Sequence, residues 1–191
     1  TLLNGLLYQF PPLTQVARGG IVHRLDKDTS GLMVVALTEQ AQVHLVRQLQ
    51  ERTVLREYLA LCHGFLYGSG VIDLPVGRDA RVPVRMATQN AIAPRQARTQ
   101  YEVLEHGLFD RGIAVSLVQC RLETGRTHQI RVHLSSQNHP LLGDEIYGGK
   151  PLAGAARQML HARALQFTDP ATEQAVHFEM EPPADFQDVY G

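Results

Sequence analysis

The 191-residue sequence predicts one α+β domain built on a mixed, mostly antiparallel sheet. Segments with strand composition outnumber those with helical periodicity, and several neighbouring strands are separated only by short turns, as in hairpins. A hydrophobic content of 44% and a charged content of 19% are globular values, not those of a disordered chain. No apolar run approaches the roughly 20 residues that cross a bilayer. With no signal peptide visible, a cytoplasmic protein without a membrane partner is expected.

The first third of the chain predicts two helices and three strands. A Leu-rich helix should end at Pro11, because a proline ring cannot continue a helix. Thr38 can cap a second helix over 39–52, on which Val43, Val46 and Leu49 share one stripe. Apolar, β-branched or alternating runs indicate strands at 32–37, 56–62 and 71–76.

Residues 77–98 are rich in Arg, Pro and Gln and poor in apolar side chains, which predicts an exposed hairpin or loop. The formal net charge of −1 argues by itself against a nucleic-acid partner, but the field around a protein depends on where its charges sit. Arginines of this region form either one basic face or a set of scattered, solvated charges: Arg78, Arg81, Arg85, Arg95 and Arg98.

The C-terminal half alternates predicted strands with turns. Two strands, 99–103 and 113–122, should be joined by a turn at 105–107. A helix is expected to start near a Thr127 cap and to end at Asn138–Pro140. Gly143 and Asp144 begin an ordered loop, after which strand patterns return at 160–167 and 175–178.

A dense polar cluster around Asp26 is the main candidate for chemistry. Asp26 lies between Arg24 and Lys27 at the predicted edge of the sheet. Neighbouring cations favour the ionised form of a carboxyl group, the form in which it acts as a nucleophile. The alternative is a well-capped surface turn, which Asp, Thr, Ser and Gly also favour.

Metal and cofactor sites are not expected. His128 and His133 are five residues apart, not the four that place two ligands on one helical face. Cys62 and Cys120 lie in apolar runs and indicate small buried residues in a reducing compartment. No glycine-rich phosphate loop or dinucleotide fingerprint follows any predicted strand.

Three separate strings together resemble the RluA/RluD family of pseudouridine synthases, and most closely its RluD branch. The strings are His23-Arg24-Leu25-Asp26 with Thr29-Ser30-Gly31, Arg56-x-Tyr58-x-Ala60, and 124–131, which reads Thr-Gly-Arg-Thr-His-Gln-Ile-Arg. The likeness extends over nearly the whole chain and implies the pseudouridine synthase fold, with helices and loops flanking the sheet and a catalytic cleft across it. Residues 1–191 are then one catalytic domain, without the S4-type RNA-binding domain usual in this branch.

The resemblance also implies roles for particular residues. Asp26 would be the nucleophile, Tyr58 would lie against the flipped base and act in proton transfer, and Arg131, rather than Arg126 of the same string, would pair with Asp26. Arg24 would enter the stack in place of the uridine; the alternative is a surface pair with Asp28. Arg126 would contact phosphate or be purely structural. The apolar surface under the uracil would come from Ile130, from 160–162 and from Leu165.

The implied function is isomerisation of uridine to pseudouridine in RNA by a monomer, in a stem-loop of bacterial 23S ribosomal RNA. Attack on the ribose C1′, attack on uracil C6 and formation of a glycal all remain open for Asp26. Three alternatives are kept: a synthase acting on tRNA, an inactive RNA-binding module of the same fold, and a metal-dependent hydrolase using Asp26, Asp28 and histidines.

Overall fold

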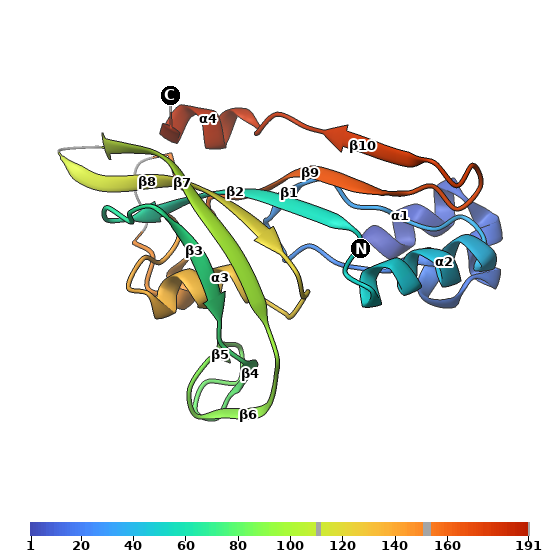
Figure 1. The fold of residues 1–191 in the computed structure, drawn as a ribbon, viewed down its shortest axis with the longest axis horizontal. Helices are drawn as coiled ribbons and strands as arrows, with labels where there is room; N and C mark the ends of the chain where they lie inside the picture. The colour runs from blue at the N-terminus through green and yellow to red at the C-terminus, as the bar shows by residue number, and fades with distance from the viewer. Residues whose placement is uncertain (110–111, 151–153, 191) are drawn as a thin grey trace.

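The computed structural model describes residues 1–109, 112–150 and 154–190. A seven-stranded sheet runs through it in the order β1-β9-β2-β8-β7-β3, with β10 also paired to β9 (Figure 1). Only the β1–β9 pair is parallel, so the prediction of a mixed, mostly antiparallel sheet in an α+β fold is confirmed. The strands are β1 (Ser30–Gly31), β2 (Leu55–His63), β3 (Ser69–Asp73), β7 (Arg98–Phe109), β8 (Ile113–Leu122), β9 (Leu160–Thr168) and β10 (Ala175–Glu179).

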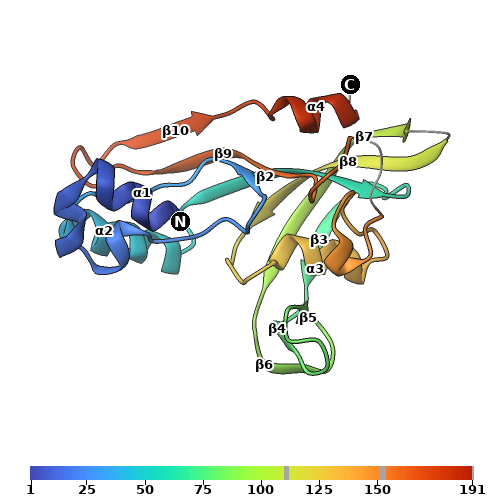
Figure 2. The same ribbon diagram turned by 180° about the vertical axis from the view of Figure 1, so that it is seen from behind.

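Helices flank this sheet and cluster at its two ends. Helices α1 (Leu2–Gln9) and α2 (Glu39–Gln50) lie near one end, and α3 (Gln129–Ser136) lies towards the other (Figures 1 and 2). The Thr38 side chain accepts a hydrogen bond from the Ala41 N–H at 3.1 Å, which confirms the predicted cap of α2. Helix α4 (Ala184–Tyr190) and the 3₁₀ turns Pro11–Gln15, Ala17–Gly20 and Glu145–Tyr147 complete the described helical segments.

A small second sheet projects from the large one. It consists of β4 (Val76–Asp79), β5 (Met86–Ala87) and β6 (Ala91–Arg95), in the order β5-β4-β6 (Figures 1 and 2). The predicted exposed hairpin at 77–98 is therefore confirmed. Its arginines do not form one free basic face, because Arg85 lies over the Tyr147 ring and Arg98 pairs with Glu123.

Three local predictions are wrong. Residues 32–37 form no strand, only an isolated bridge between Val35 and Ile21, because the chain leaves β9 after Gly31 on its way to α2. The turn expected at 105–107 is part of β7, where a bulge between Val103 and Glu105 absorbs the irregularity. His128, in the left-handed conformation, precedes α3 in place of a Thr127 cap.

Strand β2 is the centre of the hydrophobic core, because alternate residues pack into different clusters. Tyr58, Ala60 and Cys62 pack with Ile130 and Leu134 of α3. Leu59 and Leu61 pack with other apolar residues, including Met159 and Phe186. Cys62 and Cys120 are buried and free, as expected. A strand covered in this way is a rigid support for the polar side chains that it carries.

Candidate active site

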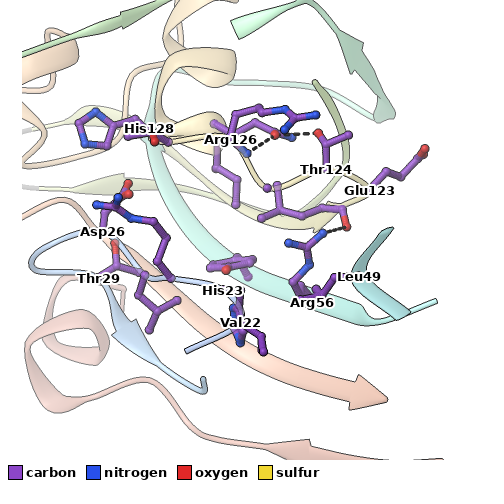
Figure 3. Close-up of a pocket in the computed structure, with 18 of the residues that line it drawn as sticks. Val22, His23, Asp26, Thr29, Leu49, Arg56, Glu123, Thr124, Arg126 and His128 are labelled. Carbon is purple, nitrogen blue, oxygen red and sulfur yellow. Dashed lines mark hydrogen bonds between the residues drawn. The ribbon is translucent and has the colours of Figure 1, made fainter. Parts of the chain in front are cut away.

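A cleft of about 600 Å³ lies where the three sequence strings meet. Its lining includes the segment around Asp26, Arg56 and Tyr58 of β2, and the turn that leads into α3 (Figure 3). Asp26 of the first string and Arg131 of the last are 105 positions apart in the chain, so only the fold brings them together. The lining residues used below are His23, Arg24, Asp26, Arg56, Tyr58, Gly125, Arg126, His128, Ile130 and Leu160.

Asp26 is held at the edge of the sheet by the turn that follows it. The Thr29 N–H donates to the Asp26 carbonyl at 3.0 Å, and Ser30 and Gly31 then pair in parallel with β9. Gly31 has a φ of +112°, and a Cβ at this position would lie 2.2 Å from the Ala162 carbonyl oxygen. Glycine is therefore needed here, both for the backbone angle and for the close approach of β9.

Arg131 forms an ion pair with the Asp26 carboxylate. Its Nη1 lies 3.3 Å from Asp26 Oδ2. Its Nε and Nη2 donate to the two carboxylate oxygens of Asp144 at 2.7 and 2.9 Å. The Arg131 and Asp144 side chains are only 4% and 1% exposed. Such a two-point contact fixes the guanidinium plane, so Asp144 orients the Nη1 that faces Asp26.

The competing arginine, Arg126, does not pair with Asp26 in the described structure. Its Nε donates to the Gln96 carbonyl at 3.0 Å, while the side chain still lines the cleft. Burial acts to lower the pKa of Arg131, but the hydrogen bond and charge of Asp144, with a smaller effect of Asp26, raise it above its usual value. Arg131 is therefore a permanent cation beneath Asp26.

Tyr58 faces the same cleft from β2 and is 6% exposed. Burial raises the pKa of Tyr58 to about 12, with Arg56 acting to lower it and Asp26 to raise it. At neutral pH the phenol therefore keeps its proton and is available as a hydrogen-bond donor.

Tyr147 connects the cleft floor to the small sheet. The Arg131 guanidinium lies over the Tyr147 ring, with Arg131 Cζ 5.1 Å from the ring centroid. The Tyr147 hydroxyl accepts a hydrogen bond from the Met86 N–H at 2.8 Å. The same hydroxyl is 2.8 Å from His128 Nδ1. Burial lowers the pKa of His128 and raises that of Tyr147 to about 12, so both groups are neutral at pH 7. The contact is then a hydrogen bond between two uncharged side chains.

The other predicted substrate residues are placed unevenly. Arg24 is exposed and lines the cleft. In the described part of the chain, no ion pair joins Arg24 to Asp28. Ile130 is 3% exposed and also lines the cleft. Of the two leucines of β9 expected beneath the uracil, Leu160 lines the cleft, whereas Leu165 is buried opposite Arg56 and is not a lining residue.

Two residues that shape the site are not identified by the sequence. Asp144 is expected only in a loop, and its place beside Gly143 is the one available signal. Gln129 lies in the third string, but nothing in the sequence indicates that its side chain bonds to Thr124, Arg98 and Thr99 and thereby fixes the turn above α3. Long-range bonds of this kind depend on tertiary placement.

Within 1–109, 112–150 and 154–190, no three His, Cys, Asp or Glu side chains are grouped so that they could hold a metal ion. None of the helices in these ranges is long and apolar enough to cross a membrane.

Known proteins resemble this chain in both sequence and fold. A family model described as RNA pseudouridylate synthase matches residues 4–136. The chain is 50% identical over 194 residues to a protein of Nitrosomonas europaea named ribosomal large subunit pseudouridine synthase D, covering 97% of this chain and 54% of that protein. A protein of the same name from Vibrio parahaemolyticus is 46% identical, at 97% and 59% coverage. The chain thus spans about half the length of the curated relatives that it matches.

A solved structure agrees with this match. Human RNA pseudouridylate synthase domain containing 1 superposes with a TM-score of 0.76 at 35% identity, over 96% of this chain and 74% of that one. The predicted pseudouridine synthase fold is therefore confirmed. By sequence and by fold, the chain belongs to the RNA pseudouridylate synthase family.

Proposed function

We propose that this chain is the catalytic domain of an RNA pseudouridine synthase that isomerises uridine in large-subunit ribosomal RNA. The observation that carries the proposal is the ion pair between the buried Arg131 and Asp26, which lines the cleft together with Tyr58. The names of the relatives from Nitrosomonas and Vibrio support the choice of ribosomal RNA over tRNA.

The reaction breaks the bond between uracil N1 and ribose C1′ and forms a bond between C5 and C1′. The proton on C5 leaves and N1 gains one, so no atom or electron is exchanged with a cofactor. Asp26 is the proposed nucleophile, attacking C1′ or uracil C6, or alternatively assisting formation of a glycal. Arg131 keeps the carboxylate oriented and supplies the nearest positive charge.

Tyr58 acts with its proton in place. With a pKa of about 12, its phenolate fraction at pH 7 is on the order of 10⁻⁵. A role that begins with the hydroxyl donating a hydrogen bond or proton is therefore favoured over one that begins with phenolate. The ring also offers a flat surface against which the uracil can lie.

The uridine must leave its stack before it can reach Asp26, at a cost of a few kcal/mol that is smallest in a loop. A stem-loop of 23S ribosomal RNA is therefore the proposed substrate. Arg24, which is exposed at the cleft, is proposed to enter the vacated position, and Arg126, which also lines the cleft, is proposed to contact phosphate. Ile130 and Leu160 supply apolar surface for the uracil. We further propose that the protein acts as a monomer in the cytoplasm.

The test is pseudouridine mapping of large-subunit RNA from the source organism with and without the gene. At least one uridine should lose its modification, and wild-type protein should restore it where Asp26→Asn does not. A purified chain that leaves every uridine of that RNA unchanged, alone and in the full-length protein, would overturn the proposal. An inactive RNA-binding module would bind the RNA without this change.

A further inference from the structure

Arg56 is a buried cation that has no anionic partner among the described residues. The residue is 7% exposed, and its Nε has no hydrogen-bond partner. Its one described hydrogen bond is a long one, from Nη2 to the Leu122 carbonyl at 3.4 Å (Figure 3). The nearby acids are engaged elsewhere: Glu57 with Arg121, and Glu123 with Arg52 and Arg98.

This arrangement is unfavourable for the free protein. Burial lowers the pKa of Arg56, but a guanidinium remains charged under all physiological conditions. A buried charge without a counter-charge destabilises a fold, and a well-packed apolar side chain of the same size is often tolerated better. A function at this position explains why an arginine stands there.

The position of Arg56 in the cleft indicates where a ligand would reach it. Arg56 and Asp26 lie on opposite sides of His23 (Figure 3). His23 accepts the Val34 N–H at Nε2, 3.0 Å away, and burial with the charge of Arg56 lowers its pKa to about 4. The ring is therefore neutral and gives Arg56 no counter-charge. Chemistry at Asp26 and binding at Arg56 thus occupy different parts of one cleft.

The charge of the cleft selects the class of ligand. Its acidic lining residues are Asp26 and Glu123, and both are already paired with arginines. Its cationic lining residues are Arg18, Arg24, Arg52, Arg56 and Arg126. A ligand that offered only a neutral carbonyl would leave the excess of positive charge in the cleft uncompensated. A phosphate carries the opposite charge and matches the geometry of the guanidinium N–H groups.

We propose that Arg56 binds a backbone phosphate of the RNA strand, at a nucleotide neighbouring the one whose base reaches Asp26. The inference rests on the proposed function, because it takes the ligand of the cleft to be RNA. Gly125 allows the Arg56 guanidinium to lie close to the backbone of the turn, since a Cβ at position 125 would lie 2.6 Å from Arg56 Nη1. The glycine leaves the fork room beneath the turn that precedes α3.

The first test measures RNA affinity by fluorescence anisotropy as a function of salt, using a labelled stem-loop and the variants Arg56→Met and Arg56→Lys. Loss of one phosphate contact should reduce the slope of log affinity against log salt by about one. Affinity at low salt should fall about tenfold or more for Arg56→Met, as for other charge-assisted hydrogen bonds, and less for Arg56→Lys. The matched control is Arg121→Met, on the neighbouring strand and paired with Glu57, which should leave the slope unchanged.

The thermal midpoint of the RNA-free protein separates a binding role from a structural one. Because the Arg56 charge is uncompensated, Arg56→Met should melt at the wild-type temperature or above it. A clearly lower midpoint with an unchanged salt slope would overturn the inference and make Arg56 a structural residue.

A second test identifies the phosphate. Replacing one phosphate at a time by a neutral methylphosphonate should reveal one position near the target uridine where wild-type binding weakens and Arg56→Met binding does not weaken further. If methylphosphonate at every position weakens RNA binding by the wild type and by Arg56→Met equally, the inference fails. Binding requires no turnover, so RNA that binds with this pattern but is not isomerised would overturn the proposed function alone.

Discussion

Asp144→Asn is expected to reduce both stability and turnover, although Asp144 does not line the cleft. The carboxylate of Asp144 accepts from Arg131 Nε and Nη2 at 2.7 and 2.9 Å and is 1% exposed. An amide of the same shape can accept only one of these bonds, and its NH₂ group would then face an N–H of the guanidinium. Arg131 would be left free to rotate towards Asp26, its other carboxylate partner.

The size of the effect follows from the burial of the pair. Breaking a buried ion pair from one side costs about 3–5 kcal/mol. Because the asparagine keeps one hydrogen bond, we expect the lower end, about 3 kcal/mol. For a domain of this length each kcal/mol lowers the melting temperature by about 2–4 °C, so the midpoint should fall by roughly 6–12 °C. Turnover should fall at least about tenfold, with RNA affinity little changed.

The assay pairs a thermal melt with single-turnover kinetics, in which release of tritium from C5 of the target uridine reports the chemical step. The control is Asp185→Asn, which removes a carboxylate from a 2.6 Å pair with Arg157 but is 44% exposed. An exposed pair contributes at most about 1 kcal/mol, so this variant should behave as wild type. Wild-type melting and turnover for Asp144→Asn would refute the reasoning. A lower midpoint with unchanged turnover would show that the contact between Asp144 and Arg131 is structural and does not position Asp26.

The proposed roles of the cleft residues give four further predictions. Asp26→Asn should reduce turnover below about one per cent of wild type while RNA affinity and melting temperature hold, and higher turnover in a deamidation-controlled preparation would contradict a nucleophilic role. Tyr58→Phe should slow the single-turnover rate far more than it weakens binding, because the ring is kept; the reverse pattern would make Tyr58 only a platform for the base. Arg131→Met should be inactive and Arg126→Met should mainly weaken RNA binding, and an exchange of these two outcomes would reverse their assignment. Arg24→Ala should lose activity on a folded stem-loop and regain part of it when the target uridine is already unpaired, whereas equal losses on both substrates would indicate general phosphate binding.

The sequence alone predicts features that depend on neighbouring residues. The Thr38 cap, the helix that ends before Pro11 and the hairpin at 77–98 follow from side-chain chemistry within a few positions, and the structure contains all three. The resemblance singled out Asp26 and Arg131 from separate strings, and their contact at 3.3 Å agrees with that expectation.

Only the tertiary structure decides which distant groups meet. Asp144 became the second partner of Arg131 because a loop after α3 returns beneath it, which no local pattern encodes. The face on which Leu165 lies is also decided by the tertiary structure. Between β2 and β9 the register skips Arg163, and this bulge pairs Leu165 with Arg56, although simple alternation from Leu160 would put Leu165 on the other face of the sheet. The unpaired charge of Arg56 likewise appears only when every nearby carboxylate has been placed, because a counter-charge is a property of space and not of sequence order.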